Sequence, residues 1–253
     1  MTDRKQHVVD ILKSFETGDT RALQMINPAK YIQHNLTVAD GVGALAARIA
    51  AIPKGTATVN TVREFEDGDF VFTHSVYKVG GVERVAFDIF RFEGNQITEH
   101  WDNLQELATK PAHTMIDGPT TSTDPELTEA NRALLKQYME DVFFQGRKEK
   151  FPTYFAGNNY IQHNPLILDD GLSGLAAGLK ALGERGITVR YDRVHMVLAE
   201  GNFVLVVNEG AFAGEPTAIY DLYRVQDGKI AEHWDTLQSI PPQTEWKNAN
   251  GKF

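Results

Sequence analysis

The sequence contains no cysteine, no long apolar run and no cluster of basic residues. Without cysteine there can be no disulfide, no thiolate nucleophile and no cysteine-ligated zinc. No stretch approaches the ~20 apolar residues that a helix needs to cross a bilayer, and the polar N-terminus lacks the apolar segment of a secretory signal. A net charge of −9 argues against a nucleic-acid-binding surface, which needs clustered lysine and arginine. We therefore expect a soluble, cytoplasmic protein without a nucleic-acid or membrane partner.

Two common catalytic motifs are also missing. The Gly41-Val42-Gly43 segment lacks the rest of a dinucleotide-binding fingerprint. The sequence has no Gly-x-Ser-x-Gly elbow that would present a serine nucleophile. Dinucleotide-dependent and serine-dependent chemistries are therefore not expected.

Two segments of the sequence occur twice. Tyr31–Asn35 reads Tyr-Ile-Gln-His-Asn, and Tyr160–Asn164 repeats it without change. Further along the chain, Asp88–Gln105 aligns without a gap with Asp221–Gln238, and nine of these 18 positions are identical. Both blocks end in Glu-His-Trp-Asp followed by Leu-Gln after one variable position. The 253 residues thus form a tandem duplication of a domain of about 120 residues, a common domain size.

Composition marks the boundaries of the two copies. A stretch that is rich in turn-forming residues joins them and includes Pro111, Gly118, Pro119 and Pro125. A polar tail follows the second copy. Such tails are often loosely held, although Phe253 could anchor this one. We place domain 1 at residues 1–108, the linker at 109–125, domain 2 at 126–240 and the C-terminal tail at 241–253.

Each copy shows the pattern of three helices followed by four strands. In copy one, apolar residues at helical spacing predict a helix over 3–17, which Gly18 ends. The remaining predictions are helices over 20–26 and 43–52 and strands over 58–65, 70–79, 82–92 and 97–106. In copy two they are helices over 127–144, 147–155 and 172–182 and strands over 188–198, 203–210, 215–225 and 230–238. This order is typical of an α+β domain whose helices pack on a curved antiparallel sheet and enclose a cone-shaped pocket.

The last two strands of each copy carry the candidate chemistry. Because side chains alternate along a strand, His100 and Asp102 share one face, and Glu99 and Trp101 share the other. A two-residue turn at Gly94-Asn95 would place Asp88 opposite Trp101, whereas a three-residue turn with a bulge would place it opposite His100. We favour the bulge, which brings one Asp–His–Asp group together in each copy: Asp88, His100 and Asp102, and Asp221, His233 and Asp235.

Two carboxylates and an imidazole in a semi-apolar pocket shift one another's pKa values. A carboxylate tuned in this way can take a proton from carbon next to a carbonyl group and return it elsewhere. We expect His34 and His163, each beside an asparagine, to donate to a substrate oxygen. Tyr31, Tyr160, Asn35, Asn164, Phe90 and Tyr223 are the candidate substrate-binding residues.

Two other interpretations of these residues remain open. The His-Trp pairs could simply pack, and Arg91 could simply pair with Asp102 or Glu99. Two histidines and two aspartates could also surround a metal ion, because both are good ligands. No H-x-H or H-x₃-H spacing supports a metal site, so we predict none. His7, His74, His113 and His195 have no counterpart in the other copy, and we assign them no role.

The repeated motifs resemble those of the SnoaL-like polyketide cyclases of the NTF2-like superfamily, and most closely the branch of predicted SnoaL-like aldol-condensation enzymes. The resemblance rests on Tyr-Ile-Gln-His-Asn with a following Asp-Gly, on Asp-x-(Phe/Tyr)-Arg, and on Ile-x-Glu-His-Trp-Asp-x-Leu-Gln. It covers both copies. It implies that Asp102 and Asp235 act as the acid/base of an aldol closure. Asp88 and Asp221 stand where the cyclases have a histidine, which is a departure from the family pattern.

The resemblance implies a cofactor-independent acid–base enzyme acting on a small carbonyl compound by aldol condensation, cyclisation or enolisation and isomerisation. In that enzyme Asp102 and Asp235 would be the bases, while His34, His163, His100 and His233 polarise the carbonyl group. The alternative is a protein that binds a small hydrophobic ligand without turning it over, because this fold hosts both functions. Members of the family usually dimerise through the open sheet face, so the tandem chain could form an intramolecular pseudo-dimer.

Overall fold

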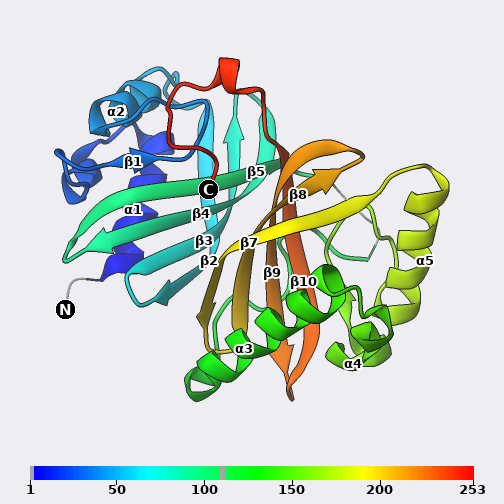
Figure 1. Cartoon of the computed structure of the whole chain (residues 1–253). Coiled ribbons are helices and arrows are strands. Elements are labelled where there is room, and N and C mark those ends of the chain that lie inside the picture. Colours follow the sequence, from blue (N-terminus) through cyan, green and yellow to red (C-terminus); the bar gives the residue numbers. More distant parts are fainter. Residues whose placement is uncertain (1–2, 109–111) are drawn as a thin grey trace. The chain divides into compact units, whose positions relative to one another are not determined.

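The computed structural model describes residues 3–108 and 112–253, so Pro111 of the expected linker lies outside the described residues. The chain divides into two compact units (Figure 1). The first, domain 1, comprises the residues up to Leu107 together with Pro241–Phe253. The second, domain 2, comprises Ala108–Ile240. Each has its own helices and five-stranded sheet, which confirms the expected pair of tandem α+β domains.

Domain 1 has the strand order β1-β5-β4-β3-β2. The short strand β1 runs parallel to β5, and the other neighbours are antiparallel. Its elements in chain order are α1 (Arg4–Thr17), a 3₁₀ turn (Arg21–Met25), β1 (Ile32–Gln33), α2 (Val42–Ala50), β2 (Ala57–Asp67), β3 (Phe70–Val79), β4 (Val82–Glu93) and β5 (Gln96–Glu106).

Domain 2 repeats this topology with the order β6-β10-β9-β8-β7. Its elements are α3 (Thr128–Met139), continued by a π-helical turn (Glu140–Phe144), α4 (Phe151–Tyr154), β6 (Ile161–Gln162), α5 (Gly171–Glu184), β7 (Val189–Glu200), β8 (Phe203–Phe212), β9 (Glu215–Gln226) and β10 (Lys229–Ser239). Short 3₁₀ turns lie at Pro125–Leu127, Lys148–Lys150, Gly157–Asn159 and, in the tail, Gln243–Glu245. None of the described helices is long and apolar enough to span a membrane.

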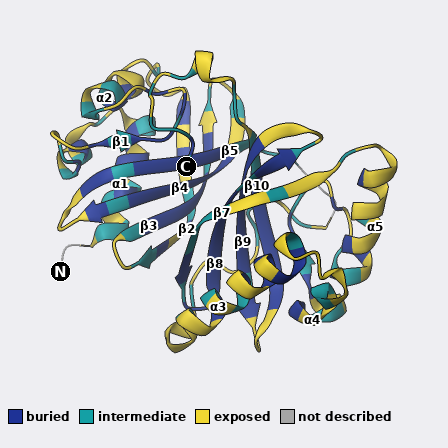
Figure 2. Cartoon of the chain, in the orientation of Figure 1, coloured by how far each residue is buried: buried dark blue, intermediate teal, exposed yellow. Residues whose placement is uncertain are grey.

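Local sequence explains the first helix. Asp3 caps α1 by accepting a hydrogen bond from the Gln6 backbone N–H, and Gly18 ends it in the left-handed conformation at φ 71°. The apolar stripe Val8, Ile11 and Leu12 is buried in the core of domain 1. Figure 2 shows the same division in both domains, with strands mostly buried and helices exposed along their outer faces.

The sequence pattern did not indicate β1 and β6. Each is a two-residue strand inside the repeated pentapeptide, too short to show any alternation. Each nevertheless pairs in parallel with the last strand of its domain, so that Gln33 lies beside His100 and Gln162 beside His233. The two repeated motifs of each copy are therefore neighbours in space.

The C-terminal tail follows domain 2 in sequence but packs on domain 1. The Lys247 backbone N–H donates to the Leu36 carbonyl at 2.8 Å, and Asn248 Nδ2 donates to the carbonyls of Asn35 and Val38, each at 2.9 Å. A second asparagine, Asn250, donates through Nδ2 to the Gln33 carbonyl and to Asp40 Oδ1. These bonds hold the tail along the first repeated pentapeptide.

We expect Asn248→Ala to destabilise domain 1. The change removes the two hydrogen bonds that Asn248 Nδ2 donates and the one that Oδ1 accepts from the Asn250 backbone N–H. Because two backbone carbonyls lose their partner, the loss should be about 1–3 kcal/mol. Thermal unfolding of the full chain measures it. Asn60→Ala, an exposed asparagine on β2, is the matched control. An equal melting temperature for both variants would contradict the anchoring role.

Candidate functional site

The β4–β5 hairpin brings the predicted acid–base residues onto one face. Asp88 pairs directly with Asp102, and His100 lies two residues before Asp102 on the same side. In domain 2, Asp221 pairs with Asp235 in the same way. The predicted common surface therefore forms in both copies.

The expected three-residue turn is wrong. Glu93 pairs with Gln96, which leaves a two-residue turn, and the extra residue lies further along β5, where Thr98 forms a bulge. The bulge flips the faces that follow it, because one added residue reverses the alternation of side chains. Asp88 consequently faces Asp102 across the ladder, and His100 pairs with Phe90 instead.

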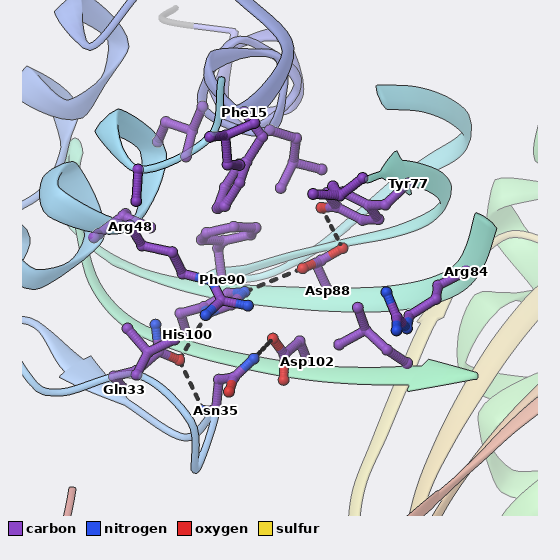
Figure 3. A pocket seen from close by; sticks show the side chains of 18 of the residues that line it. Phe15, Gln33, Asn35, Arg48, Tyr77, Arg84, Asp88, Phe90, His100 and Asp102 are labelled. Carbon is purple, nitrogen blue, oxygen red and sulfur yellow. Dashed lines mark hydrogen bonds and ion pairs between the residues drawn. The ribbon is translucent and has the colours of Figure 1, made fainter. Parts of the chain in front are cut away.

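A cavity of about 360 Å³ opens in domain 1 between α1, α2 and the sheet (Figure 3). Its walls are mostly apolar, with side chains such as Ile11, Phe15, Leu45 and Phe90. The polar side chains that line it come mainly from the two repeated motifs and from β3 and β4: Tyr31, Gln33, Asn35, Tyr77, Asp88, His100 and Asp102, with Arg48 and Arg84.

Asp102 has one restrained and one available carboxylate oxygen. Asn35 Nδ2 donates to Oδ2 at 2.5 Å, while Oδ1 is buried and makes no hydrogen bond with any described residue. The nearest cation is Lys252 of the tail, whose Nζ lies 3.6 Å from Oδ1 and donates to the Asp102 carbonyl at 2.6 Å. A buried acceptor without a hydrogen bond is costly, and a catalytic role is one of the reasons for which proteins retain such groups.

His100 lies between Gln33 and Asp88 and contacts both through its ring nitrogens. The Asn35 backbone N–H donates to Gln33 Oε1, which also lies 2.9 Å from His100 Nδ1, so Nδ1 must be the donor in that contact. His100 Nε2 then faces Asp88 Oδ1 at 3.2 Å, and one proton lies between them. Burial raises the pKa of Asp88, against the opposing effect of His100.

Two tyrosine hydroxyls complete this wall. Tyr77 donates to Asp88 Oδ2 at 2.9 Å. The Tyr31 hydroxyl is buried beside Gln33 and makes no well-formed hydrogen bond. Burial, followed by the charges of Asp102 and Asp88, raises the pKa of Tyr31 far above its usual value. Tyr31 therefore stays protonated at neutral pH and can donate to a ligand oxygen.

His34 does not line the cavity. Its ring stacks on Trp101 with centroids 4.7 Å apart, Nδ1 lies 3.0 Å from the Gly251 carbonyl, and Nε2 lies 2.9 Å from Glu99 Oε1. Glu99 also accepts from Arg91 at 2.7 Å, so the pairing expected for Arg91 goes to Glu99. The backbone of the pentapeptide alternates like a strand, and His34 consequently points to the opposite side from Gln33 and Asn35.

His163 has the same surroundings in domain 2. It stacks on Trp234 at 4.6 Å and lies between the Thr114 carbonyl and Glu232 Oε1. Asp117 Oδ1 also lies 2.8 Å from His163 Nδ1. Residues of the expected linker thus contact His163 of domain 2 in the same way as the C-terminal tail contacts His34 of domain 1.

The acid–base group of domain 2 keeps the central contacts. Asn164 Nδ2 donates to Asp235 Oδ2 at 2.5 Å, and Asp235 Oδ1 is again buried without a hydrogen bond to any described residue. Burial, only partly offset by His233, raises the pKa of Asp235 to about 6. His233 lies 2.8 Å from Asp221 Oδ1; burial alone would lower the pKa of His233, but this contact and the Asp235 charge raise it.

The remaining candidates of domain 2 make some contacts that their counterparts in domain 1 do not make. Tyr160 accepts from Gln162 Nε2 at 2.8 Å, and Tyr223 stacks on His233 at 4.7 Å. Asn208 Nδ2 donates to Asp221 Oδ2 at 2.8 Å. Tyr138 packs against the edge of the Tyr223 ring. In domain 1, by comparison, Phe90 lies on the open cavity wall beside His100.

Among the residues that the structure describes, three groups of side chains have the spacing to hold a metal ion. They are Asp88, His100 and Asp102; Asp221, His233 and Asp235; and His113, Asp117 and His163, with ligand atoms within 4.8 Å of one another in each group. In the first group Tyr77, Gln33 and Asn35 already occupy part of the ligand capacity. Asp102 Oδ1 makes no hydrogen bond with any described residue but lies 3.6 Å from the Lys252 ammonium, a neighbour that suits a proton-accepting carboxylate better than a cation ligand.

Sequence reasoning missed several residues of this site. Gln33 and Gln162 belong to the repeated pentapeptide, so their identity in both copies was an available signal. Tyr77, Arg48, Arg84 and Lys252 carried no such signal, because none has a matching residue in the other copy.

The comparisons with known proteins find similar solved structures, each of which covers less than half of this chain. No family model matches the chain, and no curated protein matches its sequence. The chain is similar in fold to a candidate ketosteroid isomerase from Kribbella flavida DSM 17836 (20% identity, 46% of this chain, 84% of that chain, TM-score 0.37). It is also similar to IdmH, a candidate polyketide cyclase from Streptomyces antibioticus (19% identity, 40% of this chain, 91% of that chain, TM-score 0.33). A third similar structure is an NTF2-like protein from Cytophaga hutchinsonii ATCC 33406 (13% identity, 42% of this chain, 92% of that chain, TM-score 0.36). At these TM-scores the likeness decides neither substrate nor reaction.

We expect Asp235→Asn to stabilise domain 2 in a pH-dependent way. Because folding raises the pKa of Asp235 from 3.8 to about 6, the folded state gains stability when this group is protonated and loses it as pH rises through 6. An uncharged amide avoids that loss. The variant should match the wild type near pH 4 and exceed it by up to about 3 kcal/mol at pH 7.5.

Urea unfolding of the full chain between pH 4 and 8 measures this difference. Glu215→Gln, which neutralises an exposed carboxylate on β9, is the control and should show no such trend. A difference between wild type and Asp235→Asn that stays constant with pH would disprove the raised pKa.

Proposed function

We propose that domain 1 is a cofactor-independent acid–base enzyme acting on a small carbonyl compound, by enolisation that leads to isomerisation or aldol closure. The observation that supports this most is Asp102 Oδ1, a buried carboxylate oxygen without a hydrogen bond on the wall of a cavity of about 360 Å³. Asn35 fixes the other oxygen, so the carboxylate is oriented before a ligand arrives.

In this proposal Asp102 removes a proton from carbon next to the carbonyl group. Negative charge then develops on the carbonyl oxygen, where a preorganised donor is most effective. Tyr31 is the donor that the cavity offers, because its hydroxyl is buried and makes no well-formed hydrogen bond. The protonated Asp102 returns its proton to another carbon, or the enolate attacks a second carbonyl.

The His100–Asp88 pair has a supporting role in the same proposal. It holds one proton near the reacting group and keeps the excess charge of two facing carboxylates low. His34 takes no part in proton transfer and instead fixes the tail through Gly251. The carbonyl-polarising role expected for His34 therefore passes to Tyr31.

We expect the protein to catalyse α-proton exchange of aryl ketones, and Asp102→Asn to abolish it. General base catalysis typically contributes about 10²–10⁴-fold, so the variant should lose at least ~100-fold in rate. Deuterium incorporation into butyrophenone and into 3-benzoylpropanoate in D₂O, followed by proton NMR, gives the rate. Asp69→Asn, an exposed aspartate in the β2–β3 turn, is the matched control.

The outcomes separate the enzyme from the binding protein that the sequence also allowed. Loss of exchange in Asp102→Asn with ligand affinity retained supports the enzyme. Binding of either ketone to the wild type without exchange above the buffer rate refutes it and favours a protein that only holds its ligand.

A further inference from the structure

Two arginines line the domain 1 cavity without an internal partner. Arg48 projects from α2 and Arg84 from β4, and both are exposed (Figure 3). Neither guanidinium forms a hydrogen bond or an ion pair with any residue that the structure describes, although the chain has 34 acidic residues against 25 basic ones. An unpaired guanidinium at a cavity is available for a ligand, and its planar fork matches a carboxylate.

The charges of this cavity are arranged in order of depth. Asp88, His100 and Asp102 are at most 8% exposed and form its buried end. Arg48 and Arg84, which line the same cavity from opposite sides of Asp88 and Asp102 in Figure 3, are exposed residues, and apolar side chains such as Phe15 line the walls. A ligand that fits this order has an anionic group, an apolar body and a polar group that reaches the buried acid–base residues.

Domain 2 lacks both arginines. The alignment of Leu45-Ala46-Ala47 with Leu175-Ala176-Ala177 places Gly178 where domain 1 has Arg48. A Cβ atom on Gly178 would lie 2.7 Å from Ile167 Cδ1, so no side chain fits there without a shift. Arg84 stands four residues before Asp88, and the same position before Asp221 is Thr217.

Lys252, a third cation near the cavity of domain 1, also has a neutral counterpart in domain 2. The carbonyl of Gly251 contacts His34 Nδ1, and the carbonyl of Thr114 contacts His163 Nδ1 in the same way. The residue that follows is Lys252 in the first case and Met115 in the second. The Lys252 ammonium lies 3.6 Å from Asp102 Oδ1 and offsets the carboxylate charge that would otherwise repel an anion.

We propose that the domain 1 cavity binds a small organic carboxylate, with Arg48 and Arg84 holding the carboxylate group and the apolar body directed toward Asp102. The same site does not exist in domain 2, where the three cations are replaced by Gly178, Thr217 and Met115. That the ligand also carries a carbonyl group rests on the proposed function; its negative charge does not.

Isothermal titration of the full chain with two matched ligands tests the inference. The probe is 3-benzoylpropanoate, and butyrophenone is its neutral analogue with a methyl group in place of the carboxylate. We expect one site per chain and about tenfold tighter binding of the carboxylate, the factor that one charge-assisted contact supplies. Added NaCl should weaken the binding of 3-benzoylpropanoate but not that of butyrophenone, because salt screens charges at exposed sites.

Arginine variants assign the effect to the cavity. Arg48→Gln and Arg84→Gln should each lower the affinity for 3-benzoylpropanoate by about fivefold to tenfold. The affinity of either variant for butyrophenone should stay within about twofold of the wild type. Arg185→Gln is the matched control, because Arg185 is an exposed arginine of domain 2 outside both acid–base groups. Equal affinity for the two ligands, two equivalent sites per chain, unchanged affinity in both arginine variants or no binding at millimolar concentration would each overturn the proposal.

This experiment measures binding alone, so it can fail separately from the proposed function. Tight binding of 3-benzoylpropanoate without α-proton exchange would support the anion site and contradict the proposed enzyme activity. Proton exchange without preference for the carboxylate does the reverse.

Discussion

The parallel pairing of a two-residue strand with the last strand of each domain determines the rest of the site. In domain 1, the register of β1 on β5 sets Gln33 beside His100, and the His34 backbone N–H donates to the His100 carbonyl. From that position the Gln33 and Asn35 side chains reach His100 and Asp102. A shift of one residue would exchange the two faces and turn His34 toward the cavity in their place. The side-chain hydrogen bonds and the register therefore depend on each other, and domain 2 repeats both.

The sequence predicted those parts of the protein that both copies retain. The duplication, the α+β order of elements and the common face of Asp88, His100 and Asp102 follow from repeated motifs and the alternation of strand residues. The turn was wrong because a two-residue turn followed by a bulge at Thr98 has the same effect on the faces as a longer turn. The direction of His34 depends on β1, which is too short to leave a periodic signal. Cations that belong to one copy could not be found from a repeat.

The two domains keep one acid–base core in different surroundings. In domain 1, Tyr77 donates to Asp88 at the edge of an open cavity. The corresponding residue of domain 2 is Gly210, where a Cβ atom would lie 1.9 Å from the Arg190 carbonyl oxygen. In domain 2 the donors to Asp221 include Asn208 Nδ2 at 2.8 Å and the Tyr191 hydroxyl at 3.4 Å. A duplicated chain can thus retain the polar network in both copies while the residues around it change.

The position of the tail has a consequence for the order of synthesis. Gln33, His34 and Asn35 leave the ribosome more than two hundred residues before Asn248, Asn250 and Gly251, which bond to that segment. Domains usually fold from the N-terminus as they are translated. Here the first domain acquires its last contacts only after the second has been made in full. A ribosome that stops early, or a tag fused after Phe253, would therefore affect the domain that was synthesised first.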